Sequence, residues 1–227
     1  MNDMERIIYN QGERLIPGVT HDVSEMVRHK SSYNFFKLII DRDIRQKLAE
    51  IPVRVLDFGC GVGYGCVMIA QIPGVLVTGV DVSPECIVYA REHYPGAAIE
   101  YLVISTDFVR AMPEYDYVVS RGVIEHIPKG LEVAAKMKWR NRLLFNVPYD
   151  EAPRNPHHLL LGVKEKDFAK FTDAELFYED LNGITYDAKT KPVSPNMITC
   201  VCSKPFLPRV SDMAVSFPLP AWPETAG

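Results

Sequence analysis

A short apolar run ends in an acid, and three glycines that alternate with other residues follow it. Asp57 is followed by Gly59, Gly61 and Gly63, and residues 53–56 ahead of them are typical of a buried strand. A backbone without Cβ atoms bends sharply and lets a ligand come close. The pattern predicts a nucleotide-type pocket at the end of a strand. A tight strand-to-helix turn without a ligand is the alternative interpretation.

The spacing of these glycines bears on the kind of nucleotide. Dinucleotide-binding folds usually carry the pattern G-x-G-x-x-G, whose third glycine sets the contact between helix and strand. Here the pattern is G-x-G-x-G, and Asp57 stands two residues ahead of the first glycine. The difference counts against an NAD-dependent oxidoreductase.

A second acid, Asp81, ends the next apolar run, residues 75–80. An acid at the carboxyl end of a second strand is placed to accept hydrogen bonds from both hydroxyls of a ribose. Ser83 is a suitable N-cap and Pro84 suits a first helical turn, so we expect a helix over residues 84–93. The alternative interpretation is that Asp81 is an acidic residue in a turn and binds no ligand.

The pattern from Asp57 to Gly63 resembles motif I, (D/E)-x-G-x-G-x-G, of the class I S-adenosylmethionine-dependent methyltransferases. Three further segments follow in the order of that family: the strand ending at Asp81, residues 99–108 and residues 115–128. The last, YDYVVSRGVIEHIP, looks very like the segment that contains and follows strand four of these enzymes. The resemblance therefore covers four ordered motifs.

The resemblance implies S-adenosylmethionine as cofactor and S-adenosylhomocysteine as product. It also implies that an acid after the third strand receives the adenine amino group and that its neighbour covers the ring, which makes Asp107 and Phe108 the candidates. The full set of expected cofactor-binding residues is Asp57, Gly59, Cys60, Gly61, Gly63, Asp81, Val82, Asp107, Phe108, Ser120 and Arg121.

Histidine is the first choice for a group that takes a proton near neutral pH, and the chain has six. His126 follows the fourth strand, and in several enzymes that this chain resembles a histidine in this stretch is the base. We expect His126 to be the general base and the adjacent Glu125 to orient or stabilise it. His157 and His158 are alternative bases or substrate hydrogen-bond donors. A structural role for the Glu125–His126 pair is the competing interpretation.

A metal-assisted reaction would need carboxylates such as Glu125, Asp150 and Glu151 to hold magnesium. These residues lack a recognisable ligand spacing. The sequence therefore predicts no metal site.

We expect an α/β fold, a Rossmann-like seven-stranded methyltransferase sheet with helices on both faces and an antiparallel C-terminal hairpin. Apolar residues at helical spacing over residues 22–50 indicate helices that cover the pocket. Segment 12–18 and the pair His29 and Tyr33 resemble the lead-in of bacterial methyltransferases encoded among glycan and natural-product genes. His29 or Tyr33 would touch the methionine end of the cofactor, or serve as ordinary helix-surface and core residues.

The predicted organisation has a helical lid segment over residues 1–50, the cofactor-binding core over residues 51–205 and a proline-rich extended tail over residues 206–227. A chain of 227 residues that is 47% hydrophobic can bury one sizeable core. The terminal hairpin is expected from the apolar runs at 176–178 and 196–202.

The net charge of −4 and the scatter of basic residues argue against nucleic acid as the main partner. The chain shows neither a signal peptide nor a run of eighteen apolar residues, and its five cysteines have no disulfide or zinc spacing. We expect a cytoplasmic monomer or homodimer without a membrane span.

The sequence thus predicts methyl transfer to a hydroxyl of a sugar, glycan precursor or other small polar metabolite. Transfer to nitrogen or carbon of a small metabolite is the first alternative. A non-catalytic nucleotide-binding protein or an NAD-dependent oxidoreductase is the alternative of another class.

Overall fold

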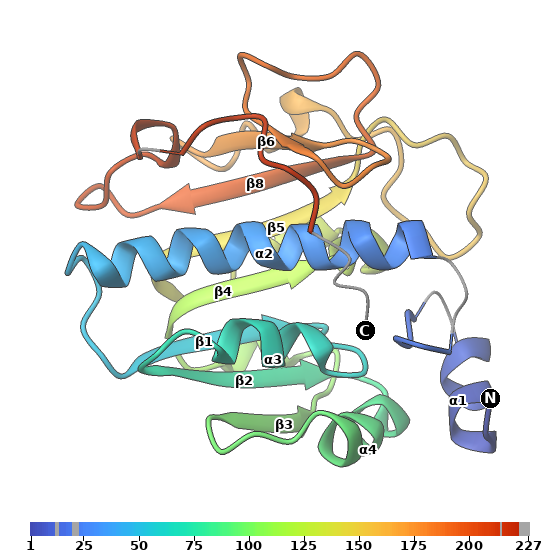
Figure 1. The fold of residues 1–227 in the computed structure, drawn as a ribbon. Coiled ribbons are helices and arrows are strands. Elements are labelled where there is room, and N and C mark those ends of the chain that lie inside the picture. Colours follow the sequence, from blue (N-terminus) through green and yellow to red (C-terminus); the bar gives the residue numbers. More distant parts are fainter. Residues whose placement is uncertain (12–13, 20–22, 214, 223–227) are drawn as a thin grey trace.

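The structure, a computed structural model, describes residues 1–11, 14–19, 23–213 and 215–222. Within these ranges the strands form an eight-stranded sheet in the order β3-β2-β1-β4-β5-β8-β6-β7 (Figure 1). The first five strands in this order are parallel, and β8, β6 and β7 run antiparallel to their neighbours. The strands are β1 (Val53–Phe58), β2 (Val75–Asp81), β3 (Ile99–Val103), β4 (Tyr115–Arg121), β5 (Trp139–Pro148), β6 (Glu175–Glu179), β7 (Thr185–Tyr186) and β8 (Met197–Ser203).

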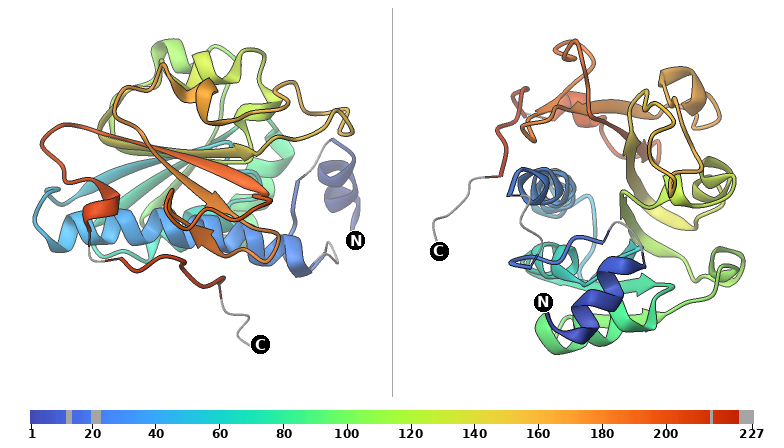
Figure 2. Two further views of the ribbon diagram at one scale, coloured as in Figure 1. Left: turned by 90° about the horizontal axis from the view of Figure 1, so that it is seen from above. Right: turned by 90° about the vertical axis from the view of Figure 1, so that its right-hand side faces the viewer.

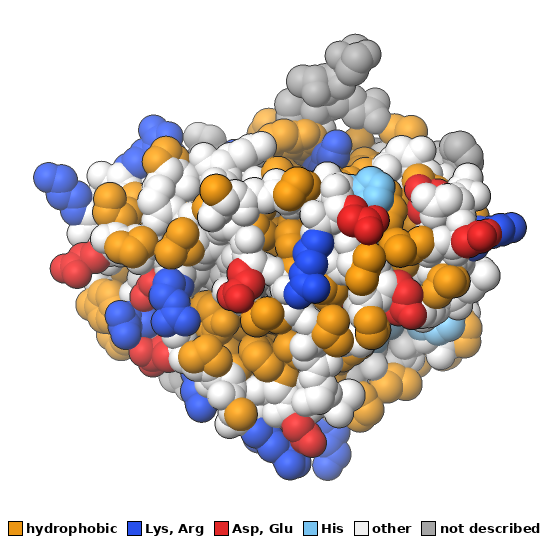
Figure 3. Space-filling model, turned by 90° about the horizontal axis from the view of Figure 1, so that it is seen from below, with side chains coloured by type: hydrophobic (Ala, Val, Ile, Leu, Met, Phe, Trp, Pro, Cys, Tyr) orange, Lys and Arg blue, Asp and Glu red, His pale blue; other side chains and the backbone are white. Residues whose placement is uncertain are grey.

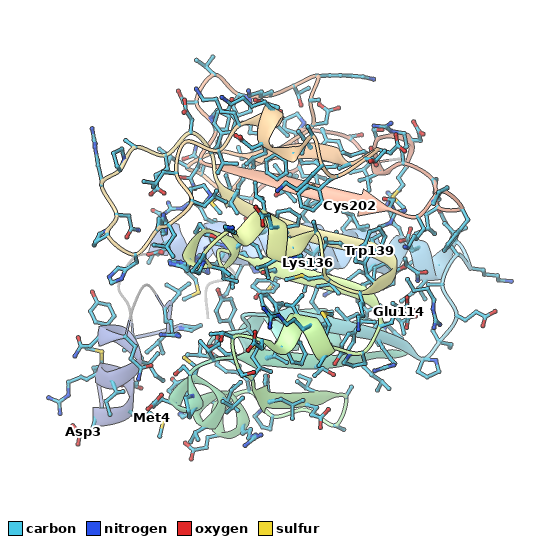
Figure 4. The ribbon with its side chains drawn as sticks, turned by 180° about the vertical axis from the view of Figure 1, so that it is seen from behind. Asp3, Met4, Glu114, Lys136, Trp139 and Cys202 are labelled. Carbon is cyan, nitrogen blue, oxygen red and sulfur yellow. The ribbon has the colours of Figure 1, made fainter. Side chains whose placement is uncertain are left out.

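Helices cover both faces of this sheet, as a Rossmann-like fold requires. The helix α2 runs across one face beside α3, with α4 farther along the sheet next to β3 (Figure 1). The short helices α5 and α6 lie on the other face, in front of the sheet when the molecule is seen from behind (Figure 4). The α-helices are α1 (Asp3–Asn10), α2 (Val23–Arg45), α3 (Tyr64–Ala70), α4 (Pro84–His93), α5 (Phe108–Ala111) and α6 (Gly130–Ala134), and the 3₁₀ turns are η1 (Ile124–His126), η2 (Glu165–Phe168) and η3 (Val210–Asp212).

The sheet confirms the predicted fold class, with one strand more than expected. β7 pairs with β6 through Tyr178 opposite Tyr186. The Asp180 carboxylate accepts hydrogen bonds from the backbone N–H groups of Asn182 and Ile184, and Gly183 has a φ of +81°. This tight, side-chain-stabilised turn returns the chain onto β6 and creates the extra strand.

The N-terminal segment contributes to the core as well as to the rim of the sheet. α2 is one continuous helix, and it buries Phe36 and Ile40 completely against the sheet. Its apolar residues pack with those of β1, β2 and α3 in one hydrophobic cluster, while a second cluster fills the opposite face. Whether residues 1–50 act as a lid stays a prediction.

The proline-rich segment after residue 205 follows the surface of the fold (Figure 2). Phe217 packs edge-on against Phe35 of α2, with ring centroids 6.1 Å apart. Leu219 forms an antiparallel bridge with Thr185 of β7. The described part of the tail thus contains the turn η3, and residues 217 and 219 are held against α2 and β7; the end of the predicted extended tail lies outside the described residues.

None of the described helices is long and apolar enough to cross a membrane. On the face shown in Figure 3, hydrophobic side chains are interspersed with acidic and basic ones.

Candidate active site

A cavity of about 780 Å³ opens at the carboxyl ends of β1, β2 and β4. It is bordered by the glycine turn after β1, the ends of these strands, the segment after β4 and residues of the N-terminal segment. The predicted cofactor-binding residues that line it are Gly59, Cys60, Gly61, Asp81, Val82, Asp107, Phe108 and Arg121. The structure thus brings most of the predicted set to one cavity.

The three glycines of the turn have different reasons to lack a side chain. All three have positive φ, with +52° at Gly61. A Cβ on Gly59 would overlap Val123, and one on Gly63 would lie 2.8 Å from the Ala90 Cβ, whereas a Cβ on Gly61 would meet nothing within 4 Å. Gly61 therefore leaves open space in the cavity wall where a ligand can touch the backbone.

Asp81 is held in place by the same turn. Its side chain is 8% exposed, and its two oxygens accept hydrogen bonds from the backbone N–H groups of Gly61 at 3.0 Å and Ser83 at 2.9 Å. The Arg14 guanidinium lies 3.4 Å from one oxygen. A carboxylate oxygen has more than one acceptor position, so Asp81 can still accept hydrogen bonds from ligand hydroxyls in the cavity. Arg14 lies in the lead-in segment, but it was not among the predicted site residues.

Asp57 lies behind the cavity wall instead of lining it. The Tyr33 hydroxyl, which belongs to a lining residue, lies 3.2 Å from both of its oxygens, and the Cys66 thiol lies 3.2 Å from one. Burial raises the pKa of Asp57 to about 7, and the hydrogen bonds from Cys66 and Tyr33 oppose that rise. Asp57 thus positions Tyr33 and the turn.

Asp107 and Phe108 stand at another side of the cavity, at the start of α5. The Asp107 side chain is 71% exposed and pairs with Arg110 at 3.4 Å. Phe108 and Ile104 are partly buried in the hydrophobic cluster of that face. A carboxylate beside an apolar wall can accept a hydrogen bond from the amino group of a planar ring that packs on that wall.

His126 and His157 line the cavity on the side of η1, and His158 does not. The His126 Nδ1 lies 3.1 Å from the carbonyl oxygen of His157. A carbonyl can only accept, so this nitrogen carries the proton and the lone pair of His126 is on Nε2. His126 can therefore act as an acceptor of protons in the cavity.

Glu125, the neighbour of His126, points into the protein and is 2% exposed. Burial raises its pKa to about 7. Its backbone oxygen accepts hydrogen bonds from the N–H groups of Leu159 and Leu160, at 2.8 and 3.1 Å. These bonds tie the loop that carries the later histidines to η1.

Residues 55–141 match a family model described as a methyltransferase domain. This match, over less than half of the chain, agrees with the resemblance to the class I S-adenosylmethionine-dependent methyltransferases. It is 37% identical over 93 residues to a demethylmenaquinone methyltransferase of Chlorobaculum tepidum, covering 39% of this chain and 36% of that protein. It is 26% identical over 170 residues to a ubiquinone biosynthesis O-methyltransferase of Bradyrhizobium diazoefficiens, covering 64% of this chain and 67% of that protein. The chain thus spans about a third of the demethylmenaquinone methyltransferase.

A solved structure supports the same fold over most of the chain. Magnesium protoporphyrin IX methyltransferase of Synechocystis with bound S-adenosylhomocysteine has a TM-score of 0.55 and 18% identity, covering 89% of this chain and 93% of that one. This likeness concerns the fold.

The remaining wall of the cavity is polar and comes from α2, α3 and β4. The His29 Nδ1 lies 2.5 Å from the Tyr64 hydroxyl, and the Arg121 guanidinium contacts the other ring nitrogen. Burial first, and then the charge of Arg121, hold the pKa of His29 well below its usual range, so the imidazole is neutral. Ser120, also predicted as a cofactor contact, is buried and donates to the Phe58 carbonyl at 2.9 Å.

The residues present fit S-adenosylmethionine, the cofactor typical of this family. Gly61 leaves the space for close approach, and Asp81 offers the acceptors for a ribose. Asp107 and Phe108 flank the place for a base, and Arg121 and Tyr64 offer donors at the opposite wall.

Proposed function

We propose that this methyltransferase moves a methyl group from S-adenosylmethionine to a hydroxyl of a small molecule, with His126 as the proton acceptor. The observation that carries the proposal is that one cavity is lined both by the glycine turn with Asp81 and by His126. The residues that would bind the cofactor and the proposed proton acceptor therefore line the same cavity.

The cofactor supplies a methyl group that is already activated on a sulfonium. The chain's part is to hold the cofactor through Asp81, to align the acceptor and to take the hydroxyl proton at His126 Nε2. Alignment contributes up to about 7 to 11 kcal/mol in well-oriented intramolecular reactions. Proton transfer to a positioned base contributes roughly 10²- to 10⁴-fold in rate.

The second part of the proposal concerns the chemical group that receives the methyl group. A hydroxyl of a sugar, glycan precursor or other polar metabolite agrees with a proton acceptor beside the cavity, and a second imidazole, that of His157, adds a group able to bind hydroxyls. The relatives named for demethylmenaquinone and for ubiquinone biosynthesis favour a quinone-type aromatic acceptor, methylated on oxygen or carbon. We propose the hydroxyl because methyl transfer to oxygen releases the hydroxyl proton directly to a base such as His126 Nε2.

Calorimetry with S-adenosylmethionine, S-adenosylhomocysteine and NAD tests the cofactor part. We expect heat from the first two and none from NAD; binding of NAD alone would indicate the oxidoreductase alternative. Transfer of labelled methyl groups to a panel of nucleotide sugars, phenols and amines, read by mass spectrometry, tests the acceptor. Labelling of amines alone would contradict a hydroxyl acceptor.

A further inference from the structure

Glu125, His126 and His158 form a cluster beside the cavity. One ligand atom from each lies within 4.8 Å of the others. Glu125 and His126 come from η1, and His158 comes from the loop that the Glu125 backbone oxygen holds through two N–H groups. The sequence shows no ligand spacing here because the third residue is brought in by the fold.

Both imidazoles of the cluster are oriented by an acceptor at Nδ1. For His126 the acceptor is the carbonyl of His157 at 3.1 Å, and for His158 it is the Glu151 carboxylate. The proton then sits on Nδ1 and the lone pair on Nε2. The Asn155 amide nitrogen lies 3.1 Å from the His158 Nε2, so this amide occupies the lone pair of His158, and an ion bound there would displace it. Metal-binding histidines usually donate their other N–H to a carbonyl or carboxylate in this way.

The carboxylate of the cluster supplies an independent observation. The Oε2 of Glu125 is buried and has no hydrogen-bond partner among the described residues. A buried carboxylate oxygen without a partner is costly, and a cation beside the imidazole nitrogens would satisfy it.

We propose that Glu125, His126 and His158 bind a divalent transition metal ion. Two imidazoles and one carboxylate suit ions such as Zn²⁺, Mn²⁺ and Co²⁺, whereas Mg²⁺ and Ca²⁺ prefer oxygen ligands throughout. Because His126 also lines the cavity, the ion would border the space that the methyl acceptor enters. An ion bound by three side chains has coordination positions left for that acceptor.

The role of the ion rests on the proposed function, whereas its binding does not. An acceptor hydroxyl that coordinates the ion has a lowered pKa. Its proton passes to the His157 imidazole or to water, and the oxygen forms its bond to the methyl carbon as the sulfur–carbon bond breaks, leaving neutral S-adenosylhomocysteine. With the ion bound, His126 Nε2 is an ion ligand instead of the proton acceptor, and the lowered pKa of the coordinated hydroxyl takes the place of that direct role.

Titration of the untagged, chelator-treated protein with Co²⁺, followed by visible absorption, tests the site. We expect one Co²⁺ per chain with d–d bands of nitrogen and oxygen coordination. His158→Ala is expected to weaken binding at least about tenfold. His157→Ala is the matched control, since it removes the neighbouring imidazole and keeps the backbone carbonyl that orients His126. Glu125→Gln, which preserves shape, is expected to weaken binding as well.

Failure to bind Co²⁺, or equal weakening in His157→Ala and His158→Ala, would overturn the metal site. Circular dichroism of each variant shows whether it is folded. If His158→Ala does not fold, the Co²⁺ affinity of Glu125→Gln tests the metal site instead. Calorimetry with S-adenosylhomocysteine on the same metal-free protein separates the two proposals: loss of that binding refutes the methyltransferase function, whereas absent Co²⁺ binding refutes the ion alone.

Discussion

Replacing Asp81 by Ala is expected to weaken S-adenosylhomocysteine binding by about 10- to 150-fold. The carboxylate lies on the cavity wall, fixed by the Gly61 and Ser83 N–H groups at 3.0 and 2.9 Å. Hydrogen bonds to a charged group contribute about 1.5–3 kcal/mol, and about 1.4 kcal/mol corresponds to a tenfold change in affinity. These two values give the expected range.

Asp81 also accepts hydrogen bonds from the Gly61 and Ser83 N–H groups. The affinity lost in Asp81→Ala therefore includes both the missing contacts to the ribose and a less well fixed glycine turn. Asp81→Asn keeps the shape and one acceptor oxygen, and a smaller loss is expected. Calorimetry at fixed salt measures both variants, with an analogue that lacks the ribose hydroxyls as the second ligand. Wild-type protein should bind that analogue more weakly than S-adenosylhomocysteine, and Asp81→Ala should discriminate far less. An unchanged dissociation constant in Asp81→Ala would refute the ribose role.

Three further changes test other residues of the cavity and the core. Gly61→Ala should lower the stability by about 1–2 kcal/mol because of the left-handed backbone at this position, and it should weaken S-adenosylhomocysteine binding at least about tenfold. Gly63→Ala is the comparison variant: its Cβ would lie 2.8 Å from the Tyr101 hydroxyl, so it should lower the melting temperature further. Equal binding in wild type and Gly61→Ala would contradict the close approach of the ligand to Gly61. His126→Ala should depress turnover about 10²-fold or more with little change in cofactor affinity, and near-normal turnover would move the proton-accepting role to another histidine. Burial raises the pKa of Glu179 to about 7 from an ordinary value near 4.5, so the folded state holds a proton that the unfolded state has released, and stability falls as pH rises through this window. Glu179→Gln should flatten the fall in melting temperature between pH 5 and pH 8, and an unaltered slope would show that this carboxyl does not contribute.

The parallel half of the fold could be read from the sequence because its signals are local. Strand-length apolar runs predicted β1 to β4, and the cap at Ser83 predicted α4. In the structure the Ser83 hydroxyl accepts from the Cys86 N–H at 3.2 Å, and the helix spans Pro84–His93 as expected. Such patterns depend on neighbours within a few residues, so no tertiary information is needed.

Elements whose ends are set by tertiary contacts were placed less well. After β5, residues 165–168 form the 3₁₀ turn η2, followed by a turn in which Phe171 packs beside Phe145 with ring centroids 5.3 Å apart. The helix α5 was not predicted, since four residues carry too short a period to be recognised.

In the candidate site, too, the features set by local sequence were predicted and those set by tertiary contacts were not. Motif spacing predicted which strand ends meet, but it could not show which side chains turn toward the cavity. Asp57 turns behind the wall, and Glu125 turns inward while His126 faces the cavity. Arg14 was missed because only the folded chain brings it to Asp81.

The most direct test of the central claim is a crystal structure of this protein grown with S-adenosylhomocysteine. We expect the adenosyl group in the cavity against Gly61, with its ribose hydroxyls on the Asp81 carboxylate and the thioether sulfur on the side of His126. An adenosyl group bound elsewhere, or a cavity filled by side chains beside Gly61 at saturating ligand, would contradict it.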